Sequence, residues 1–137
     1  MNPGLTCSFL LALTLVGSPV CAQSFPSKPL RLVIGSYPGG GIDLAGRIIA
    51  QKMSENLGQQ VIVDNRGGAN GIIGTEAAAR SAPDGYTITL IPSGHAVNAS
   101  LYRKLPYDLV KDFTPITLAG TSPLMLAVHP SLPAKSV

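Results

Sequence analysis

The sequence is poor in charge and in aromatic residues, and it has no tryptophan. Charged residues make up 12% and aromatic residues 5% of its 137 residues. The formal net charge is +3, and Arg103-Lys104 is the only adjacent basic pair. Because a nucleic-acid footprint needs clustered Lys and Arg, this scattered charge argues against a nucleic-acid partner.

Cysteine is also scarce. Cys7 and Cys21 are the only two, and both lie in an amino-terminal segment that we expect to be removed. Without that segment the chain has no thiol for a disulfide, a nucleophile or a metal site. Apolar residues nevertheless make up 45% of the sequence, which permits a buried core and is unlike a disordered chain.

The segment 1–22 has the pattern of an export signal. Its apolar run at 9–16 is too short to span a bilayer. Pro19 ends that run, and Val20-Cys21-Ala22 has the small-residue spacing of a cleavage site, so we expect cleavage after Ala22. No Lys or Arg precedes Lys28, so the usual basic start is missing, and a buried amino-terminal helix is the alternative.

Apolar runs bounded by glycine-rich turns predict strands alternating with helices. This alternation indicates right-handed crossovers and a parallel sheet with helices on its faces. Gly58 is expected to close the first helix in the left-handed conformation. Strands are predicted at 30–34, 61–63 and 86–91, with further short ones at 116–119 and 124–128, and helices at 43–57, 72–80 and from about residue 96.

Three loops follow the first three strands, at 35–42, 64–71 and 92–98, and all are rich in Gly, Ser and Asn. In an open α/β sheet, ligands bind where such loops lead from strand ends into helices. Each helix start carries about half a positive charge from its aligned peptide dipoles. This edge therefore suits an anion such as a carboxylate, even without Lys or Arg.

The first of these loops fails the nucleotide-binding patterns. Gly39 and Gly41 fill two positions of G-x-G-x-x-G, but the third falls on Leu44, and no G-K-[ST] follows. The glycines could also serve only as a tight turn, with Asp43 favourable in the first helical turn.

Catalytic patterns are weak as well. His95 lies in the third loop without an evident partner nearby in sequence, so contact with a ligand and a plain surface role both stay open. His129, before Pro130, is expected to be structural. No G-x-S-x-G or metal-ligand spacing is present, and the carboxylates are isolated. These observations favour binding without chemistry.

A series of motifs runs in order through nearly the whole chain after residue 22. They are PSKPLRLV at 26–33, YPGGGIDLAGR at 37–47, VIVDNRGGANGIIG at 61–74, APDGYT at 82–87, LYRKLPYD at 101–108 and KDF at 111–113. Together they resemble a known family, the periplasmic solute-binding proteins of the tripartite tricarboxylate transporters (Bug-type receptors).

The resemblance implies an α/β, periplasmic-binding-protein-like (type II) fold, with a parallel sheet and flanking helices, truncated to part of its first domain. The expected organisation is a signal peptide at 1–22, a partial solute-binding domain at 23–128 and the start of a crossover to a missing second domain at 129–137. It further implies a monomeric periplasmic protein that binds small carboxylates without a cofactor or metal and delivers them to the membrane subunits of a transporter.

Carried onto this chain, the family's cleft would be formed by residues from the three loops. The first loop would contribute Tyr37, Gly40, Gly41, Ile42 and Asp43, the second Asn70 and Gly71, and the third Ser93, Gly94, His95 and Asn98.

Two positions depart from the family pattern. Ile42 stands where a hydroxyl or small residue is usual, and Gly67 stands where a proline is usual. We expect the first change to remove a hydrogen bond to the ligand and the second to loosen the second loop. Two other readings of the chain stay open: a truncated product without function, and a small exported enzyme in which His95 or a carboxylate has an unseen partner.

Overall fold

The computed structural model describes residues 24–123 and 125–133. The expected export signal at 1–22 lies outside these residues, as do 134–137 of the expected crossover. The core of the described residues is a parallel sheet in the order β2-β1-β3. It is formed by β1 (Leu30–Ile34), β2 (Val61–Asn65) and β3 (Thr87–Leu90). Leu30 pairs with Val61 on one side, and Arg31 pairs with Thr87 on the other.

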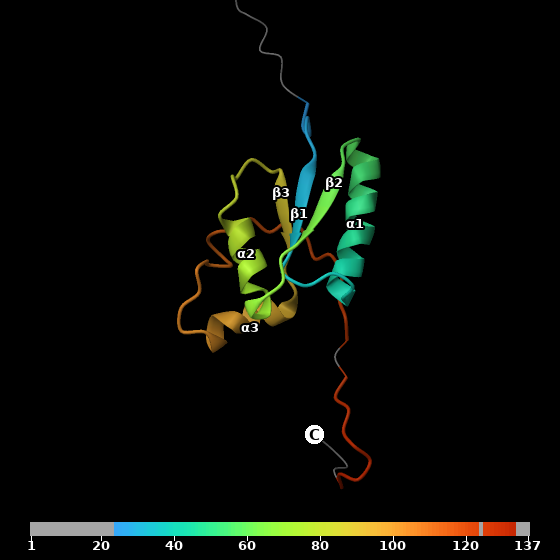
Figure 1. Ribbon diagram of the computed structural model, residues 1–137, viewed down its shortest axis with the longest axis vertical. Helices are drawn as coiled ribbons and strands as arrows, with labels where there is room; N and C mark the ends of the chain where they lie inside the picture. Colours follow the sequence, from blue (N-terminus) through green and yellow to red (C-terminus); the bar gives the residue numbers. More distant parts are fainter. Residues whose placement is uncertain (1–23, 124, 134–137) are drawn as a thin grey trace, which may run out of the picture.

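Helices α1 (Gly41–Leu57) and α2 (Ile72–Ala79) connect these strands and lie on opposite faces of the sheet (Figure 1). The strand order explains this arrangement. The chain moves from β1 to β2 in one direction and then back across β1 to β3, and right-handed crossovers in opposite directions fall on opposite faces. The short η1 (Ala69–Gly71) precedes α2, and α3 (Ser93–Leu101) lies below the carboxyl ends of the strands (Figure 1). The predicted α/β fold with a parallel sheet is confirmed.

The core sits on β1, whose central position buries it from both sides. Leu32, Val33 and Ile34 are at most 1% exposed. A methyl group on Gly46 of α1 would overlap the Ile34 side chain, and one on Gly74 of α2 would lie 2.6 Å from the Gly35 Cα. Glycine therefore lets a helix backbone approach β1 closely on each face.

At the amino ends of the strands, the segment before β1 is fastened to the start of β3. The Ser27 backbone N–H donates to the Tyr86 hydroxyl at 2.9 Å. Lys28 pairs with Asp84 at 3.2 Å and stands 4.3 Å from the centre of the Tyr86 ring, against which the Phe25 ring also packs. We call these five residues the amino-end clamp.

The helix and strand limits differ from the prediction by two or more residues in three places, and both ends of β3 and the end of α2 differ by one residue. The first helix begins at Gly41, β2 runs two residues further to Asn65, and α3 begins at Ser93 instead of near residue 96. Gly58 closes α1 with φ of 66°, as expected. The start of α3 matters because Ser93 and Gly94 suggested a loop, whereas they form the first turn of the helix, with Pro92 at its N-cap.

The prediction of strands in the last third was wrong for the described residues. Residues 116–119 and 125–128 have no sheet partner, and Ile116, Leu118 and Met125 are 78–91% exposed. Their apolar, β-branched composition suits a strand, but a strand needs a neighbour to hydrogen-bond.

In the described part of the chain no helix is long and apolar enough to cross a membrane.

Candidate functional site

Three helices begin at the carboxyl edge of the sheet, and none has a side-chain cap. The residues before α1, α2 and α3 are Gly40, Gly71 and Pro92, which carry no capping oxygen. The first N–H groups of a helix have no partner within the helix and normally need one. The positive ends of their dipoles therefore face this edge, which suits an anion.

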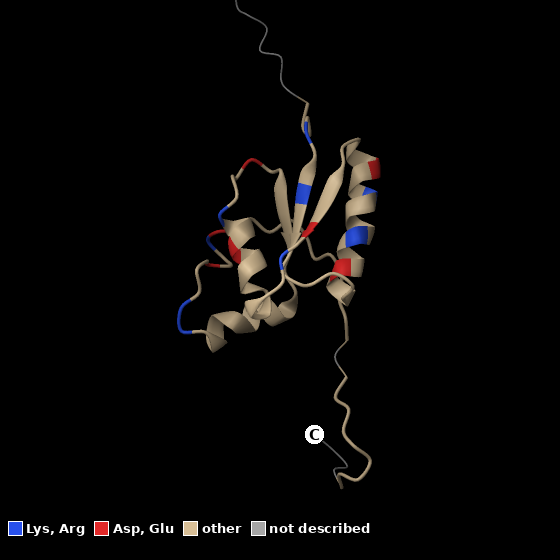
Figure 2. Ribbon diagram, in the orientation of Figure 1, with Lys and Arg blue, Asp and Glu red and all other residues tan. Residues whose placement is uncertain are grey.

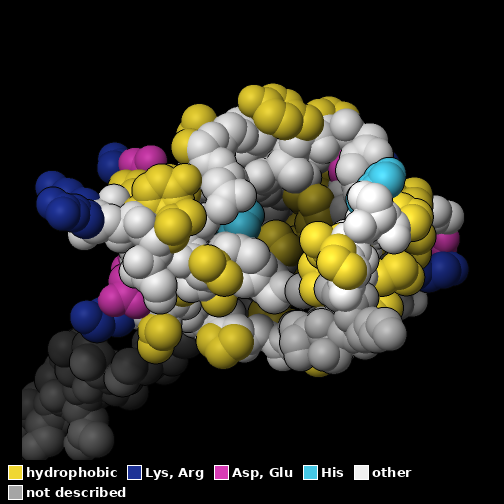
Figure 3. All heavy atoms as spheres, turned by 90° about the horizontal axis from the view of Figure 1, so that it is seen from below, with side chains coloured by type: hydrophobic (Ala, Val, Ile, Leu, Met, Phe, Trp, Pro, Cys, Tyr) yellow, Lys and Arg dark blue, Asp and Glu magenta, His cyan; other side chains and the backbone are white. Residues whose placement is uncertain are grey.

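The first loop, the second loop and the start of α3 line a hollow of about 470 Å³. Figure 3 looks at this edge from below and shows it recessed, with apolar side chains around the opening. No charged side chain lines the hollow, and α3 carries no Lys, Arg, Asp or Glu (Figure 2). The lining residues are Gly35, Ser36, Tyr37, Gly68, Ala69, Asn70, Gly71, Pro92, Gly94 and His95.

The wall from the second loop has an unusual backbone. Gly68, Ala69, Asn70 and Gly71 all have positive φ, at 125°, 45°, 51° and 82°. Such a run costs free energy for Ala and Asn and persists only where surrounding contacts impose it. The fully buried Asn98 supplies them: its Nδ2 donates to the Asn70 carbonyl at 3.0 Å, and its Oδ1 accepts from Asn70 Nδ2 at 2.6 Å.

His95 lies at the back of the hollow and is 7% exposed. Its Nδ1 is 3.2 Å from the Thr75 hydroxyl, which itself donates to the Gly71 carbonyl at 3.0 Å. Burial lowers the pKa of His95, so the ring is neutral at physiological pH. A methyl group on Gly71 would overlap Nε2 of the ring, so only glycine lets η1 pass beside it.

Asp43 is turned into its own loop. Its Oδ2 accepts from the Gly39 N–H at 2.9 Å and from Arg47 Nε at 3.0 Å. The Arg47 guanidinium, with help from the Gly39 N–H, lowers the pKa of Asp43 to about 2. This carboxylate therefore fixes the start of α1 and stays charged, and its side chain does not line the hollow.

Tyr37 reaches from the first loop to the second. Its ring lies flat on Gly67, where a methyl group would be within 2.9 Å of three ring atoms. Glycine at position 67 permits this contact with the Tyr37 ring, and the expectation that Gly67 loosens the second loop stays a prediction. Tyr37 is still 70% exposed and offers its other face to the hollow.

The structure gathers five of the eleven predicted site residues around the hollow: Tyr37, Asn70, Gly71, Gly94 and His95. Gly40, Gly41, Ile42, Asp43, Ser93 and Asn98 lie outside its lining. Asp43 and Asn98 support the surrounding loops instead. Sequence reasoning missed Thr75, although a lone threonine in an alanine-rich helix is a usable signal, and it missed the wall residues Gly35, Ser36, Gly68, Ala69 and Pro92.

Catalytic machinery is not evident in the described residues. They contain no group of three His, Cys, Asp or Glu that could hold a metal ion. The neighbour of His95 is the Thr75 hydroxyl, which is 1% exposed and therefore out of reach of a substrate. The geometry favours binding.

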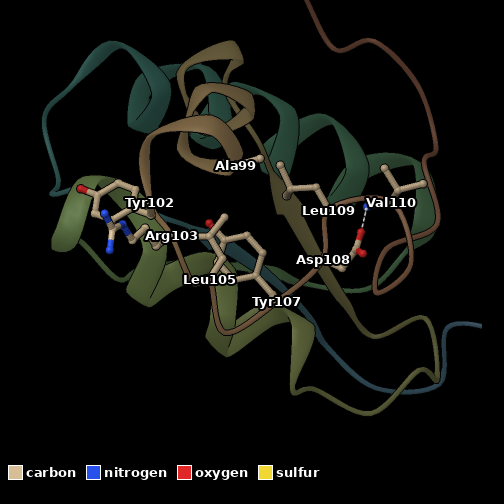
Figure 4. Close-up of a pocket in the computed structure, with 8 residues that line it drawn as sticks. All are labelled: Ala99, Tyr102, Arg103, Leu105, Tyr107, Asp108, Leu109 and Val110. Carbon is tan, nitrogen blue, oxygen red and sulfur yellow. Dashed lines mark hydrogen bonds between the residues drawn. The ribbon is translucent and has the colours of Figure 1, made fainter.

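A second hollow, of about 310 Å³, lies between the end of α3 and the segment 102–110 (Figure 4). Tyr102, Arg103, Leu105 and Tyr107 are among its lining residues, and Tyr107 also packs edge-on against Phe113. This hollow receives neither a helix start nor a predicted site residue, so the first hollow is the candidate site.

Comparison with known proteins agrees with this geometry. Residues 45–137 match the family described as "Tripartite tricarboxylate transporter family receptor". Protein BugT of Bordetella pertussis (strain Tohama I) is 40% identical over 124 residues, which are 89% of this chain and 38% of that protein. The chain thus spans well under half the length of this relative.

Two solved structures are similar in fold. The periplasmic binding protein BugD has a TM-score of 0.65 and 40% identity, over 67% of this chain and 31% of that one. Rpa4515 of R. palustris, solved with adipate, has a TM-score of 0.64 and 39% identity, over 66% of this chain and 31% of that one. The sequence match and the shared fold lead to one conclusion: this chain belongs to the receptor family of the tripartite tricarboxylate transporters.

Proposed function

We propose that this chain forms one wall of the solute-binding cleft of a periplasmic receptor for small carboxylates, which it delivers to the membrane subunits of a tripartite transporter. The observation that carries the proposal is the meeting of the uncapped starts of α2 and α3 at a hollow that no charged side chain lines. Backbone donors and dipoles attract a carboxylate there, and no Asp or Glu repels it.

The wider organisation is part of the same proposal. Residues 1–22 act as a signal peptide cleaved after Ala22, 23–128 form part of the first domain, and 129–137 begin a crossover. BugT's greater length supports a cleft whose other wall is contributed by residues outside this chain. The adipate in the Rpa4515 structure supports a carboxylate ligand. We further propose that the receptor to which this chain belongs acts as a monomer without a cofactor.

Binding to a panel of mono- and dicarboxylates, measured by thermal shift and isothermal titration calorimetry, tests the proposal. The sharpest variant is Gly94→Asp, because Gly94 lines the hollow and a side chain there meets nothing within 4 Å. A carboxylate in the first turn of α3 favours the helix but repels an anionic ligand. We expect at least a tenfold loss of affinity, which is about 1.4 kcal/mol, without loss of stability.

Gly120→Asp is the matched control. Gly120 has equally open space around it and lies outside the lining of the hollow, so the same added charge should leave affinity unchanged. Equal loss in both variants would mean that net charge matters and the hollow does not. Absence of binding to every carboxylate would favour the reading of a non-functional product, and turnover of a substrate would favour an enzyme.

A further inference from the structure

The orientation of the His95 ring fixes which of its nitrogens carries the proton. The Thr75 hydroxyl has one hydrogen, and it goes to the Gly71 carbonyl, which can only accept. The oxygen of Thr75 is then the acceptor in its 3.2 Å contact with His95 Nδ1. Nδ1 therefore bears the hydrogen, and Nε2 of the neutral ring is left with a lone pair.

Nε2 has no hydrogen-bond partner among residues 24–123 and 125–133. It lies beside Gly71, at the point where a side chain on that residue would overlap it, and both residues line the hollow. Nε2 can therefore accept a hydrogen bond from a donor group of a ligand. It is an acceptor in a site that otherwise presents the backbone N–H groups of helix starts.

The surroundings keep the ring neutral. The elements packed around it contribute Gly35 and Ser36 after β1, Gly71 of η1 and Thr75 of α2, none of which ionises near neutral pH. Tyr37 is the only other titratable residue in the lining, and no Asp or Glu faces the ring. Burial and the positive ends of α2 and α3 both disfavour an imidazolium ion.

We propose that His95 is a specificity-determining residue that accepts a hydrogen bond from the ligand, so that the site selects carboxylates bearing a hydroxyl or another donor beside the carboxylate. The inference rests on the proposed function, and it narrows the ligand class. The helix starts take the carboxylate, and Nε2 takes the neighbouring hydroxyl. A second carboxylate at that point would meet a lone pair and be repelled.

The ring state is tested first, without any ligand. In the ¹⁵N-histidine-labelled chain, long-range ¹H–¹⁵N NMR spectra at neutral pH distinguish the two neutral tautomers. We expect the Nδ1–H form for His95, whereas the exposed His129 serves as the internal reference. Thr75→Val removes the acceptor that holds the hydrogen on Nδ1, and Thr75→Ser keeps it. We expect the tautomer to change in the first variant only.

Ligand choice is tested with acids that differ by one hydroxyl: malate against succinate, and 2-hydroxyglutarate against glutarate. The hydroxy acid should bind about tenfold more tightly in each pair, and His95→Phe should remove the difference. His129→Phe should leave it intact. NMR of the complexes should show His95 still neutral, with no proton taken up.

The outcomes separate the two proposals. These measurements use a receptor that contains both walls of the cleft, and binding of none of the four acids there would refute the carboxylate-receptor function and the selectivity with it. Equal binding within each pair, a proton on Nε2, or proton uptake on binding succinate would overturn the role of His95 and leave the receptor function standing. A preference that survives His95→Phe would assign the selection to another residue.

Discussion

At the amino ends of β1 and β3 the chain is held by charged and aromatic side chains, whereas at the carboxyl ends it is held by glycine, asparagine and backbone. The amino-end clamp uses Lys28, Asp84 and two rings, and the Lys28 and Asp84 side chains are 59% and 42% exposed. The edge of the hollow uses the buried Asn98 and His95 and four consecutive positive φ angles.

The two ends therefore differ in how strongly a substitution should affect them. Exposed ion pairs contribute little and tolerate change. A buried asparagine network and a left-handed loop are easily disrupted. Each buried polar group needs a hydrogen-bond partner, and each positive φ angle must be held by the surrounding contacts. Among residues 24–123 and 125–133, the run of four positive φ angles and its asparagine network lie at the hollow, where the proposed ligand would bind, so stability and function should respond differently at the two ends.

The largest effect is expected from Gly71→Ala. The new methyl group overlaps His95 Nε2 and must adopt φ of 82°, which L side chains rarely do. We expect a loss of about 2–4 kcal/mol in the free energy of unfolding, measured by urea denaturation, together with displacement of the His95 ring. Gly94→Ala in the same hollow should be nearly neutral, since open space surrounds that residue. Similar losses in both would contradict a steric origin.

An intermediate effect is expected from Asp43→Asn, and it depends on pH. The folded pKa is lowered from 3.8 to about 2, so the stabilisation by this carboxylate is present above 3.8 and is lost as pH falls through the folded value. Acid titration of stability by circular dichroism should therefore show a steeper loss between these two values in the natural chain than in the variant. Parallel curves would mean that Arg47 and Gly39 do not hold this charge.

The smallest effect is expected at the other end of the sheet, from Lys28→Ala. Its ion pair with Asp84 and its position over the Tyr86 ring are exposed to solvent, so we expect a loss of about 1 kcal/mol or less. The difference from the natural chain should shrink further at high salt. A loss as large as that of Gly71→Ala would show that both ends are equally critical and would remove the contrast.

Local signals in the sequence were sufficient for the fold of residues 30–101. Apart from Arg31, the run Leu30–Ile34 is apolar because β1 is buried on both faces, and Gly58 closes α1 as its position implied. The failure at 116–119 has a physical cause: β-branched composition records a preference for strands, but it does not supply the neighbour that a strand requires.

The candidate site could be predicted only in part. Loop positions after parallel strands indicated the edge of the sheet at which Tyr37, Asn70 and His95 line one hollow. The direction in which each side chain points could not be predicted from the sequence. Asp43 has the residue type of a ligand contact but turns inward to Gly39 and Arg47, and Thr75 became relevant only through a contact 20 residues away in sequence with His95.

The glycines that flank β1 have a consequence for how this chain can vary. Gly46 packs against the Ile34 side chain and Gly74 against the Gly35 backbone, so a replacement at either position requires neighbouring atoms to move. Gly41, Gly94 and Gly120 face open space. A saturation library should therefore separate the glycines in open space, which accept many residues, from the crowded ones, which accept few and include Gly46, Gly71 and Gly74. Ligand preference can change through substitutions in the first group while the crowded positions keep the sheet and its helices in place.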